Sequence, residues 1–304
     1  MSDKIRIGTR DSELATWQAK QVQTKLQEFG HESELIFVKS EGDLDLTTPL
    51  TEMGGKGVFT KALDDALLEN RIDIAVHSFK DLPTENPLPL IVSAVMERED
   101  PRDALVAPRG TDFLNEDTGG AVIATSSNRR RAQWLHRYPN HEITNIRGNV
   151  NTRLRKVDEN GWNGAIFASA GLKRIGLDDN ISVYLDWMVP APAQGAMAVM
   201  IREEDKVMME VTSQLNHDET DLCTGIEREL LNEMEAGCSA PVGAFAEIID
   251  GSVHLSAIAL KTDGSLQYDI EVSAPISDAK GLGRKAGRKL LEMGASEIVA
   301  DLRS

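Results

Sequence analysis

Two cysteines are all that the chain of 304 residues contains, and their spacing argues against a disulfide. A helical stretch between Cys223 and Cys238 would separate them by about 22 Å, which is beyond the reach of a disulfide. We therefore expect at least one free thiol. Cys223 shares a predicted helix face with Ile226 and Leu230, so we expect it to be a buried structural residue.

The chain also lacks long apolar runs, clustered histidines and a complete phosphate-binding motif. No stretch is apolar enough to span a membrane, and the first residues, MSDKIRIGTRDSELA, lack the layout of a signal peptide, so we expect a cytoplasmic protein that binds no membrane. The six His are scattered, which predicts no metal site. Gly54-Gly55-Lys56-Gly57 resembles a P-loop, but Gly57 stands where Ser or Thr is required and Leu50 where the first glycine belongs.

Positive charge is scarce except in one segment. The chain has 49 acidic and 33 basic residues and a net charge of −16, which disfavours nucleic-acid binding because phosphate contacts require a broadly positive face. Ala121 to Arg155, in contrast, contains seven Arg, no Lys and a single acid, Glu142. Because guanidinium groups pair with carboxylate or phosphate in a two-pronged way, we expect this segment to bind an anion.

Short β-rich runs alternate with amphipathic helical patterns, which is typical of βαβ units around a mostly parallel sheet. In the first part of the chain the pattern predicts strands at 4–8, 34–39 and 72–77. A helix that Asp11 or Ser12 can cap follows the first strand, and a second helix is expected at 59–69.

The Arg-rich segment belongs to a second unit of the same kind. Strands are predicted at 121–125, 143–146 and 164–168, and each is followed closely by Arg. In open α/β sheets ligands bind beyond the carboxyl ends of the strands, so three strand ends that each deliver Arg predict one shared anion site. The alternative is a solvated, charged helix face.

The last third of the chain has a different pattern. It predicts a helix at 219–236 with Gly237 at its C′ position, three strands at 242–249, 253–260 and 266–273, and a final helix at 278–293. Asp250-Gly251 and Asp263-Gly264 are favoured hairpin-turn pairs. We expect a small antiparallel α+β domain.

Asp81 is the candidate catalytic carboxylate. It follows a predicted strand in His77-Ser78-Phe79-Lys80-Asp81-Leu82-Pro83, with Lys80 and Ser78 beside it as anion donors. A carboxylate facing collected Arg can accept a proton and stabilise a developing cation. An Asp in a loop that is paired with a neighbouring cation explains the motif equally well.

Cys238 is the candidate nucleophile or attachment point. Gly237-Cys238-Ser239-Ala240-Pro241-Val242-Gly243 surrounds the sulfur with small residues and Pro, which leaves space around it. A buried structural Cys is the alternative. Farther upstream, Pro190 to Gly195 is expected to be a rigid crossing, where Gln194 offers a polar contact to a ligand or is part of a plain linker.

Together these motifs resemble the porphobilinogen deaminase (hydroxymethylbilane synthase) family across nearly the whole chain. The order and spacing of seven motifs agree. They are Thr9-Arg10, Val76 to Pro83, Thr125 to Arg130, Ile146 to Val150, Ala170 to Gly176, Gln194-Gly195 and Gly237 to Gly243.

The resemblance implies an α/β fold with two doubly wound lobes like those of periplasmic binding proteins, plus a small C-terminal α+β domain with a three-stranded antiparallel sheet. We expect the first lobe at 1–98 and 196–214, the Arg-rich second lobe at 99–195, and the C-terminal domain at 215–304. The chain would return to the first lobe after Gln194-Gly195, and the protein would be a monomer.

The resemblance also implies a transferase of tetrapyrrole (haem) biosynthesis. Such an enzyme joins four porphobilinogen molecules head to tail, releases ammonia at each step and hydrolyses the product to hydroxymethylbilane. A dipyrromethane cofactor would be bound through a thioether to Cys238 and act as the primer. Each pyrrole carries an acetate and a propionate, which gives the collected Arg a ligand.

Roles for individual residues follow from the matching positions. Asp81 would be catalytic, assisting loss of the amino group and stabilising a positive azafulvene-like intermediate. Besides Cys238, the cofactor would be bound by Lys80, Ser78, Ser127, Arg129, Arg130, Arg147 and Gly171. The substrate would be bound by Arg10, Arg147, Arg153, Arg174, Gln194, Phe59 and Lys56.

Two other classes of protein remain as alternatives. Two α/β lobes around an anion also describe a binding protein for a small polycarboxylate, although such receptors need export. A nucleic-acid binder would use the Arg-rich segment, against the net charge of the chain.

Overall fold

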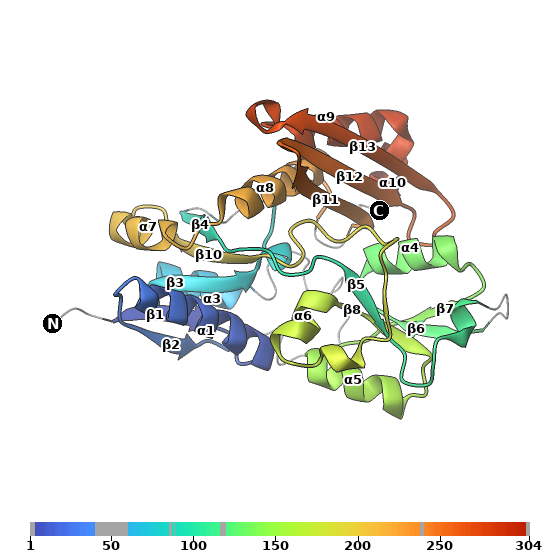
Figure 1. The fold of residues 1–304 in the computed structure, drawn as a ribbon, viewed down its shortest axis with the longest axis horizontal. Coiled ribbons are helices and arrows are strands. Elements are labelled where there is room, and N and C mark those ends of the chain that lie inside the picture. The colour runs from blue at the N-terminus through green and yellow to red at the C-terminus, as the bar shows by residue number, and fades with distance from the viewer. Residues whose placement is uncertain are drawn as a thin grey trace. The chain divides into compact units, whose positions relative to one another are not determined.

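The structure is a computed structural model that describes residues 4–39, 60–84, 87, 89–115, 120–237 and 240–301 (Figure 1). The chain divides into two compact units. Unit 1 contains residues 1–99 and 195–222, and unit 2 contains residues 100–194 and 223–304. The boundaries of the three expected domains stay a prediction.

Unit 1 is built on a five-stranded sheet, which we call the first lobe together with its helices. Its strands, in spatial order, are β2 (Ser33–Phe37), β1 (Ile5–Thr9), β3 (Ile74–Ser78), β10 (Met197–Arg202) and β4 (Leu90–Val95). β1 pairs in parallel with β2 and β3, whereas β10 is antiparallel to both of its neighbours. The chain therefore returns to this sheet after Gln194-Gly195.

Helices cover the sheet of the first lobe because their apolar faces match its alternating side chains. α1 (Glu13–Glu28) begins at Ser12, whose Oγ accepts a hydrogen bond from the backbone N–H of Ala15 at 3.3 Å. Its buried residues Val22 and Leu26 join strand residues of the core. The other helices are α3 (Lys61–Leu68), α7 (Lys206–Ser213) and the start of α8 (Asp218–Glu233).

The second lobe, in unit 2, repeats this strand order. Its strands are β7 (Glu142–Thr144), β6 (Val122–Ala124), β8 (Gly164–Ala168), β5 (Asp103–Val106) and β9 (Val183–Tyr184). β6 is parallel to β7 and β8, and β5 is antiparallel to both of its neighbours. The helices are α4 (Asn128–Arg137), α5 (Val150–Glu159) and α6 (Ser169–Arg174).

Two clusters of apolar side chains make the core of the second lobe. Ile123 and Ile166 pack with Trp134 of α4, whereas their strand neighbours Ala124 and Phe167 pack in the other cluster, with Val157 of α5. Because successive strand residues point to opposite faces, the two clusters lie on opposite faces of the sheet. The doubly wound architecture predicted from the sequence is confirmed.

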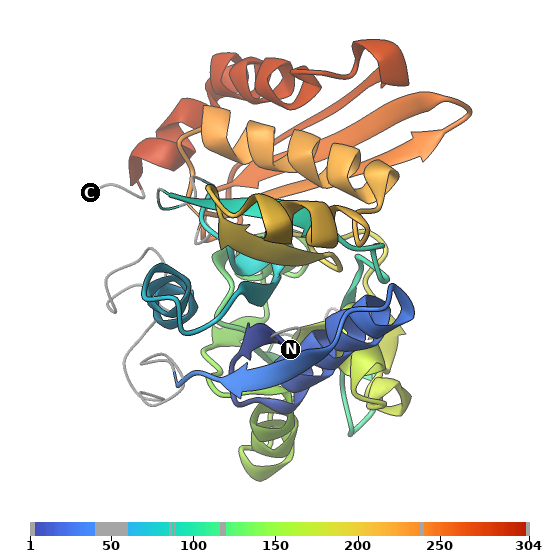
Figure 2. The same cartoon turned by 90° about the vertical axis from the view of Figure 1, so that its left-hand side faces the viewer.

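The C-terminal part of unit 2 is a three-stranded antiparallel sheet, β11 (Val242–Ile249), β12 (Ser252–Leu260) and β13 (Gln267–Pro275). α9 (Leu282–Leu290) packs against β13 and runs beside α8 (Figure 2), and α10 (Ser296–Asp301) follows it. Asp250 and Gly251 have φ of 49° and 76°, as a type I′ hairpin turn requires. The predicted α+β domain is confirmed.

Two helix ends differ from the sequence prediction. α8 ends at Glu233, and Glu235, with φ of 50°, takes the left-handed position expected of Gly237. The backbone N–H groups of Glu235 and Ala236 then bond to carbonyls of the last helical turn, as in a Schellman motif. Gly237 is outside this motif, so its assignment as C′ was wrong.

The final helix begins at Leu282 and not near residue 278. Ile276–Asp278 forms a 3-10 turn, and Gly281 follows with φ of 77°. A left-handed residue cannot continue a right-handed helix, so α9 starts only after it. Gly294, with φ of 121°, interrupts the helix again before α10.

Candidate active site

Asp81 is placed by the end of β3. The strand ends at Ser78, and Phe79–Asp81 forms a 3-10 turn whose first residue is buried and donates its backbone N–H to the Ala196 carbonyl at 3.0 Å. Leu82, 1% exposed, anchors the chain directly after the turn. The turn is therefore fixed on both sides, and Asp81 itself is exposed.

A cavity of about 80 Å³ in the first lobe brings three of the predicted site residues together. Asp81 and Ser78 come from the end of β3, and Arg10 comes from the turn between β1 and α1. Gln18, one turn into α1, donates its Nε2 to Ser78 Oγ at 2.9 Å, which orients the hydroxyl. The cavity is lined by Arg10, Ser12, Leu14, Ala15, Gln18, Thr60, Val76, His77, Ser78 and Asp81.

The charge of this cavity comes from Arg10 and Asp81, because His77 is neutral. Burial, followed by the nearby charge of Arg10, lowers the pKa of His77 to about 3. The imidazole is 6% exposed, and its Nε2 has no hydrogen-bond partner among the described residues. Among the described residues that line it, the cavity thus offers the cation of Arg10 and polar donors to an anionic ligand, with the Asp81 side chain at its edge. Lys80 is half-buried on the adjoining turn.

In the second lobe, the three strands that precede the Arg residues are adjacent. β7, β6 and β8 are parallel neighbours, so their carboxyl ends meet at one edge of the sheet, as predicted. Two helices begin there with capped N-termini: Ser127 Oγ accepts from Arg130 N at 3.4 Å, and Asn149 Oδ1 accepts from Thr152 N at 2.9 Å.

The turn that carries Arg147 is held by side chains of α5 and by the end of β6. Gly148 has φ of 114°, a conformation that favours glycine. Arg153 Nε donates to the Gly148 carbonyl at 2.7 Å, and Lys156 Nζ donates to the Arg147 carbonyl at 3.1 Å. Ser126 Oγ donates to the Ile146 carbonyl at 2.8 Å and so ties the two strand ends together. Arg147 is half-buried.

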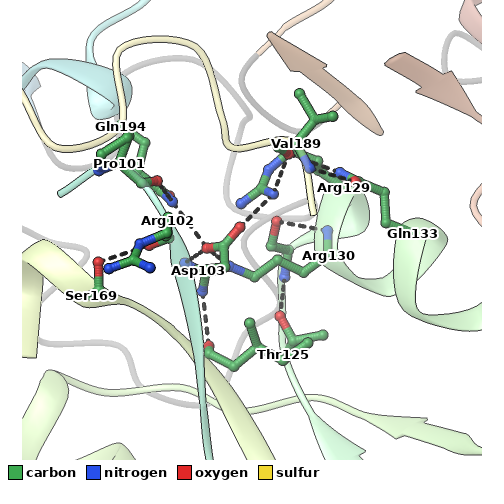
Figure 3. A network of polar contacts seen from close by, with 12 residues as sticks. Pro101, Arg102, Asp103, Thr125, Arg129, Arg130, Gln133, Ser169, Val189 and Gln194 are labelled. Carbon is green, nitrogen blue, oxygen red and sulfur yellow. Dashed lines mark hydrogen bonds and ion pairs between the residues drawn. The ribbon is translucent and has the colours of Figure 1, made fainter. Parts of the chain in front are cut away.

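Arg129 and Arg130 contact a buried acid that the sequence analysis did not single out. Asp103, the first residue of β5, is 0% exposed, and each of the two guanidinium groups lies 2.7 Å from one of its oxygens (Figure 3). Burial alone raises the pKa of Asp103, but the charges of Arg129 and Arg130 outweigh it and hold this pKa well below its usual value. The carboxylate therefore stays ionised.

The remaining predicted residues have different surroundings. Gln194 is 0% exposed and donates its Nε2 to the Pro101 carbonyl and to Asp103, so the structure places it in a buried network. Gly171 is half-buried and Arg174 is 7% exposed, both on α6. Lys56, Phe59 and Cys238 lie outside the described residues. All of their roles toward cofactor or substrate stay predictions.

Three residues of these surroundings were missed from the sequence: Asp103, His77 and Lys156. For Asp103 a signal was present, because a single acid leads the apolar run Ala104-Leu105-Val106-Ala107 and must find a counter-charge if the run is buried. His77 and Lys156 gave no such signal. Cys223 is 6% exposed, so its structural assignment is confirmed.

In the part of the chain that the structure describes, no group of three or more His, Cys, Asp or Glu is placed to hold a metal ion. No helix in the same part of the chain is long and apolar enough to cross a membrane.

Two family models match the chain. The porphobilinogen deaminase dipyromethane cofactor binding domain matches residues 5–210, and the porphobilinogen deaminase C-terminal domain matches residues 222–292. The chain belongs to the porphobilinogen deaminase family. The family resemblance predicted from the motifs is confirmed.

Two curated relatives of this family match nearly the full length. The porphobilinogen deaminase of Chromobacterium violaceum is 41% identical over 302 residues, 98% of this chain and 97% of the relative. That of Geobacter sulfurreducens is 41% identical over 304 residues, 99% of this chain and 95% of the relative.

Among solved structures, the chain is similar over about 70% of its length to two domains of other proteins. The methionine binding protein MetQ matches with a TM-score of 0.44 and 14% identity, over 70% of this chain and 91% of that chain. The VFT2 domain of Bordetella pertussis BvgS matches with a TM-score of 0.41 and 14% identity, over 71% of this chain and 90% of that chain.

Proposed function

We propose that this protein is a hydroxymethylbilane synthase, a transferase that condenses four porphobilinogen molecules head to tail with release of ammonia and then hydrolyses the product to hydroxymethylbilane. One observation carries the proposal: in a chain that matches porphobilinogen deaminases over nearly its whole length, Asp81 lines one cavity with Arg10 and Ser78. The enzyme acts in tetrapyrrole biosynthesis, in the cytoplasm and as a monomer.

The described residues fit a dipyrromethane cofactor with acidic side chains. In the first lobe, Arg10 and the Ser78 hydroxyl line a cavity large enough for a carboxylate arm. In the second, Arg129 is a buried cation whose Nε has no partner among the described residues. Cys238 would hold the cofactor by a thioether. When bound, the cofactor supplies the pyrrole carbon to which the first substrate unit is joined.

Asp81 is the residue we assign to the chemistry. Loss of the amino group leaves positive charge on the substrate, and a fixed carboxylate beside that charge lowers the free energy of the transition state. The same carboxylate can carry the proton that the leaving ammonia requires. Its placement on a turn anchored by Phe79 and Leu82 holds it in position before the substrate arrives.

The basic residues are assigned to the carboxylates of cofactor and substrate. The residues assigned to the primer are Ser78, Lys80, Ser127, Arg129, Arg130, Arg147 and Gly171. We assign to the binding of the substrate the remaining residues of the family resemblance. These are Arg10, Lys56, Phe59, Arg147, Arg153, Arg174 and Gln194.

The test replaces Asp81 by Asn, which keeps the shape and removes the charge. We expect turnover of porphobilinogen to fall at least about 100-fold, while the unfolding midpoint stays near that of the wild type because Asp81 is exposed. Asp178→Asn, at another exposed acid, is the matched control and should keep full turnover. Wild-type protein that binds porphobilinogen without consuming it would favour the receptor alternative instead.

A further inference from the structure

A buried ionic network joins β5 to the first turn of α4. Asp103 lies between Arg129 and Arg130 (Figure 3), and the three side chains are 0%, 3% and 7% exposed. Two cations share one carboxylate, so these three side chains together carry one positive charge away from water. An unbalanced buried charge is costly, and such a charge is expected to have a ligand.

All three guanidinium nitrogens of Arg130 contact other atoms of the protein. Its Nε donates to Asp103 Oδ1 at 2.9 Å, its Nη2 lies 2.7 Å from the same oxygen, and its Nη1 donates to the Ile166 carbonyl at 2.9 Å. Every nitrogen of the group is therefore engaged. A guanidinium has five N–H groups, so a further contact does not require Arg130 to give up any of these three.

Arg129 uses only one of its three nitrogens. Nη1 donates to Asp103 Oδ2 at 2.7 Å and to the Val189 carbonyl at 2.8 Å. Nε is buried without a hydrogen-bond partner, and Nη2 makes no hydrogen bond, among the described residues. The Nε and Nη2 groups form the edge of a guanidinium that pairs with a carboxylate in a two-pronged way.

The orientation of Arg129 depends on contacts that do not involve this edge. Val189, whose carbonyl accepts from Arg129, is fixed by a reciprocal pair of hydrogen bonds with Gln133, at 2.9 and 2.8 Å. Gln194 Nε2 donates to Asp103 Oδ1 at 3.0 Å and to the Pro101 carbonyl at 2.7 Å, which fixes the carboxylate in turn.

We propose that Asp103 is a positioning residue: it engages Arg130 and orients Arg129 so that the Nε–Nη2 edge of Arg129 receives one carboxylate of the cofactor or the substrate. Gln194, through its hydrogen bond to Asp103 Oδ1, also helps to hold the Asp103 carboxylate in place. The inference rests on the proposed function and adds to the arginines of the family resemblance an acid that orients them.

Asp103→Asn is the primary test, because it keeps the side-chain shape and removes the charge. The readouts are the fraction of purified protein that carries the primer, from intact mass, and KM and kcat for porphobilinogen. We expect primer loading to fall and KM to rise at least 10-fold, with kcat changed less than 3-fold because Asp81 is untouched. Asp186→Asn is the matched control, since Asp186 is an exposed partner of Arg102, and should change none of these values.

A second variant keeps the test decisive if Asp103→Asn fails to fold. Arg129→Met leaves Arg130 paired with Asp103, so its buried charges balance. It should lower primer loading and raise KM at least 10-fold. Normal loading and KM in a folded Asp103→Asn or Arg129→Met protein would overturn the proposal.

Failure of the proposed function would be visible separately. If wild-type protein neither consumes porphobilinogen nor carries a primer, that function is wrong, and succinate then serves as the carboxylate probe of the unmodified protein. The inference predicts that succinate raises the unfolding temperature of wild type but not of Arg129→Met or Asp103→Asn. The same shift in all three proteins would refute it.

Discussion

Burial distinguishes two pairs of arginines in the second lobe. Arg129 and Arg130 are almost fully buried and contact Asp103, whereas Arg147 and Arg153 are half-buried at the start of α5. Removing a member of the first group disturbs an ion pair that the fold requires, so stability and binding should change together. Removing a member of the second group should affect mainly the binding of carboxylates.

The fold disfavours the ionised form of the Asp64 carboxyl group. It is 7% exposed on α3, and its Oδ1 has no partner among the described residues. Burial is the largest cause that raises the pKa of Asp64 from 3.8 to about 6. The folded protein therefore holds this proton more tightly than the unfolded chain, so the contribution of Asp64 lowers stability as pH rises from about 4 to about 6.

Asp64→Asn should therefore stabilise the protein, and more so at higher pH. Relative to wild type, we expect a gain in the free energy of unfolding that is small at pH 4 and reaches at most about 3 kcal/mol at pH 8. Urea unfolding of both proteins at the two pH values measures it. A difference that is independent of pH would contradict the assignment of the raised pKa to Asp64.

Among the elements, the crossing at residues 190–195 is held by unusual backbone conformations. Ala193 and Gly195 have φ of 62° and 90°. Glu227 of α8 accepts the Ala193 N–H at 2.6 Å and the Ala246 N–H at 2.7 Å, which fixes the crossing to β11 within unit 2. At Gly195 a Cβ would collide with the Glu99 carbonyl oxygen. Only glycine satisfies both demands at this position.

Gly195→Ala should cost at least about 2 kcal/mol of unfolding free energy, because it adds a collision with the backbone to the strain of positive φ. Gly176→Ala is the matched control: Gly176 has φ of 67° but open space around its Cα, so only strain remains, about 1 kcal/mol. Urea unfolding compares them. Equal losses in the two variants would show that the contact with Glu99 carries no cost.

At the scale of the whole molecule, the periodicity of the sequence predicted the features that depend on residues close together in the chain. Alternation and helical spacing placed the strands of both lobes, and the Asp250-Gly251 pair marked a hairpin because it tolerates positive φ. The return of β10 into the first sheet followed only from the family resemblance, because strand pairing between residues far apart in sequence leaves no periodic signal. The prediction that Gly237 is the C′ residue of α8 was wrong, because Glu235 adopts the left-handed conformation instead.

The same limit holds for the candidate site: contacts between neighbouring strands could be predicted from the sequence, and contacts that depend on distant strand pairing could not. Parallel neighbouring strands had to bring their carboxyl ends together, so the meeting of the ends of β7, β6 and β8 at one edge could be expected. The pairing of Asp103 with two arginines could not, because it depends on β5 entering this sheet as an antiparallel strand.

The most direct test of the central claim is the intact mass of the purified protein, followed by peptide mapping across Cys238. If the protein is a hydroxymethylbilane synthase, an added mass equal to two linked pyrrole units will be found on the peptide that contains Cys238. An unmodified Cys238 in folded protein, which remains unmodified after incubation with porphobilinogen, would contradict the account.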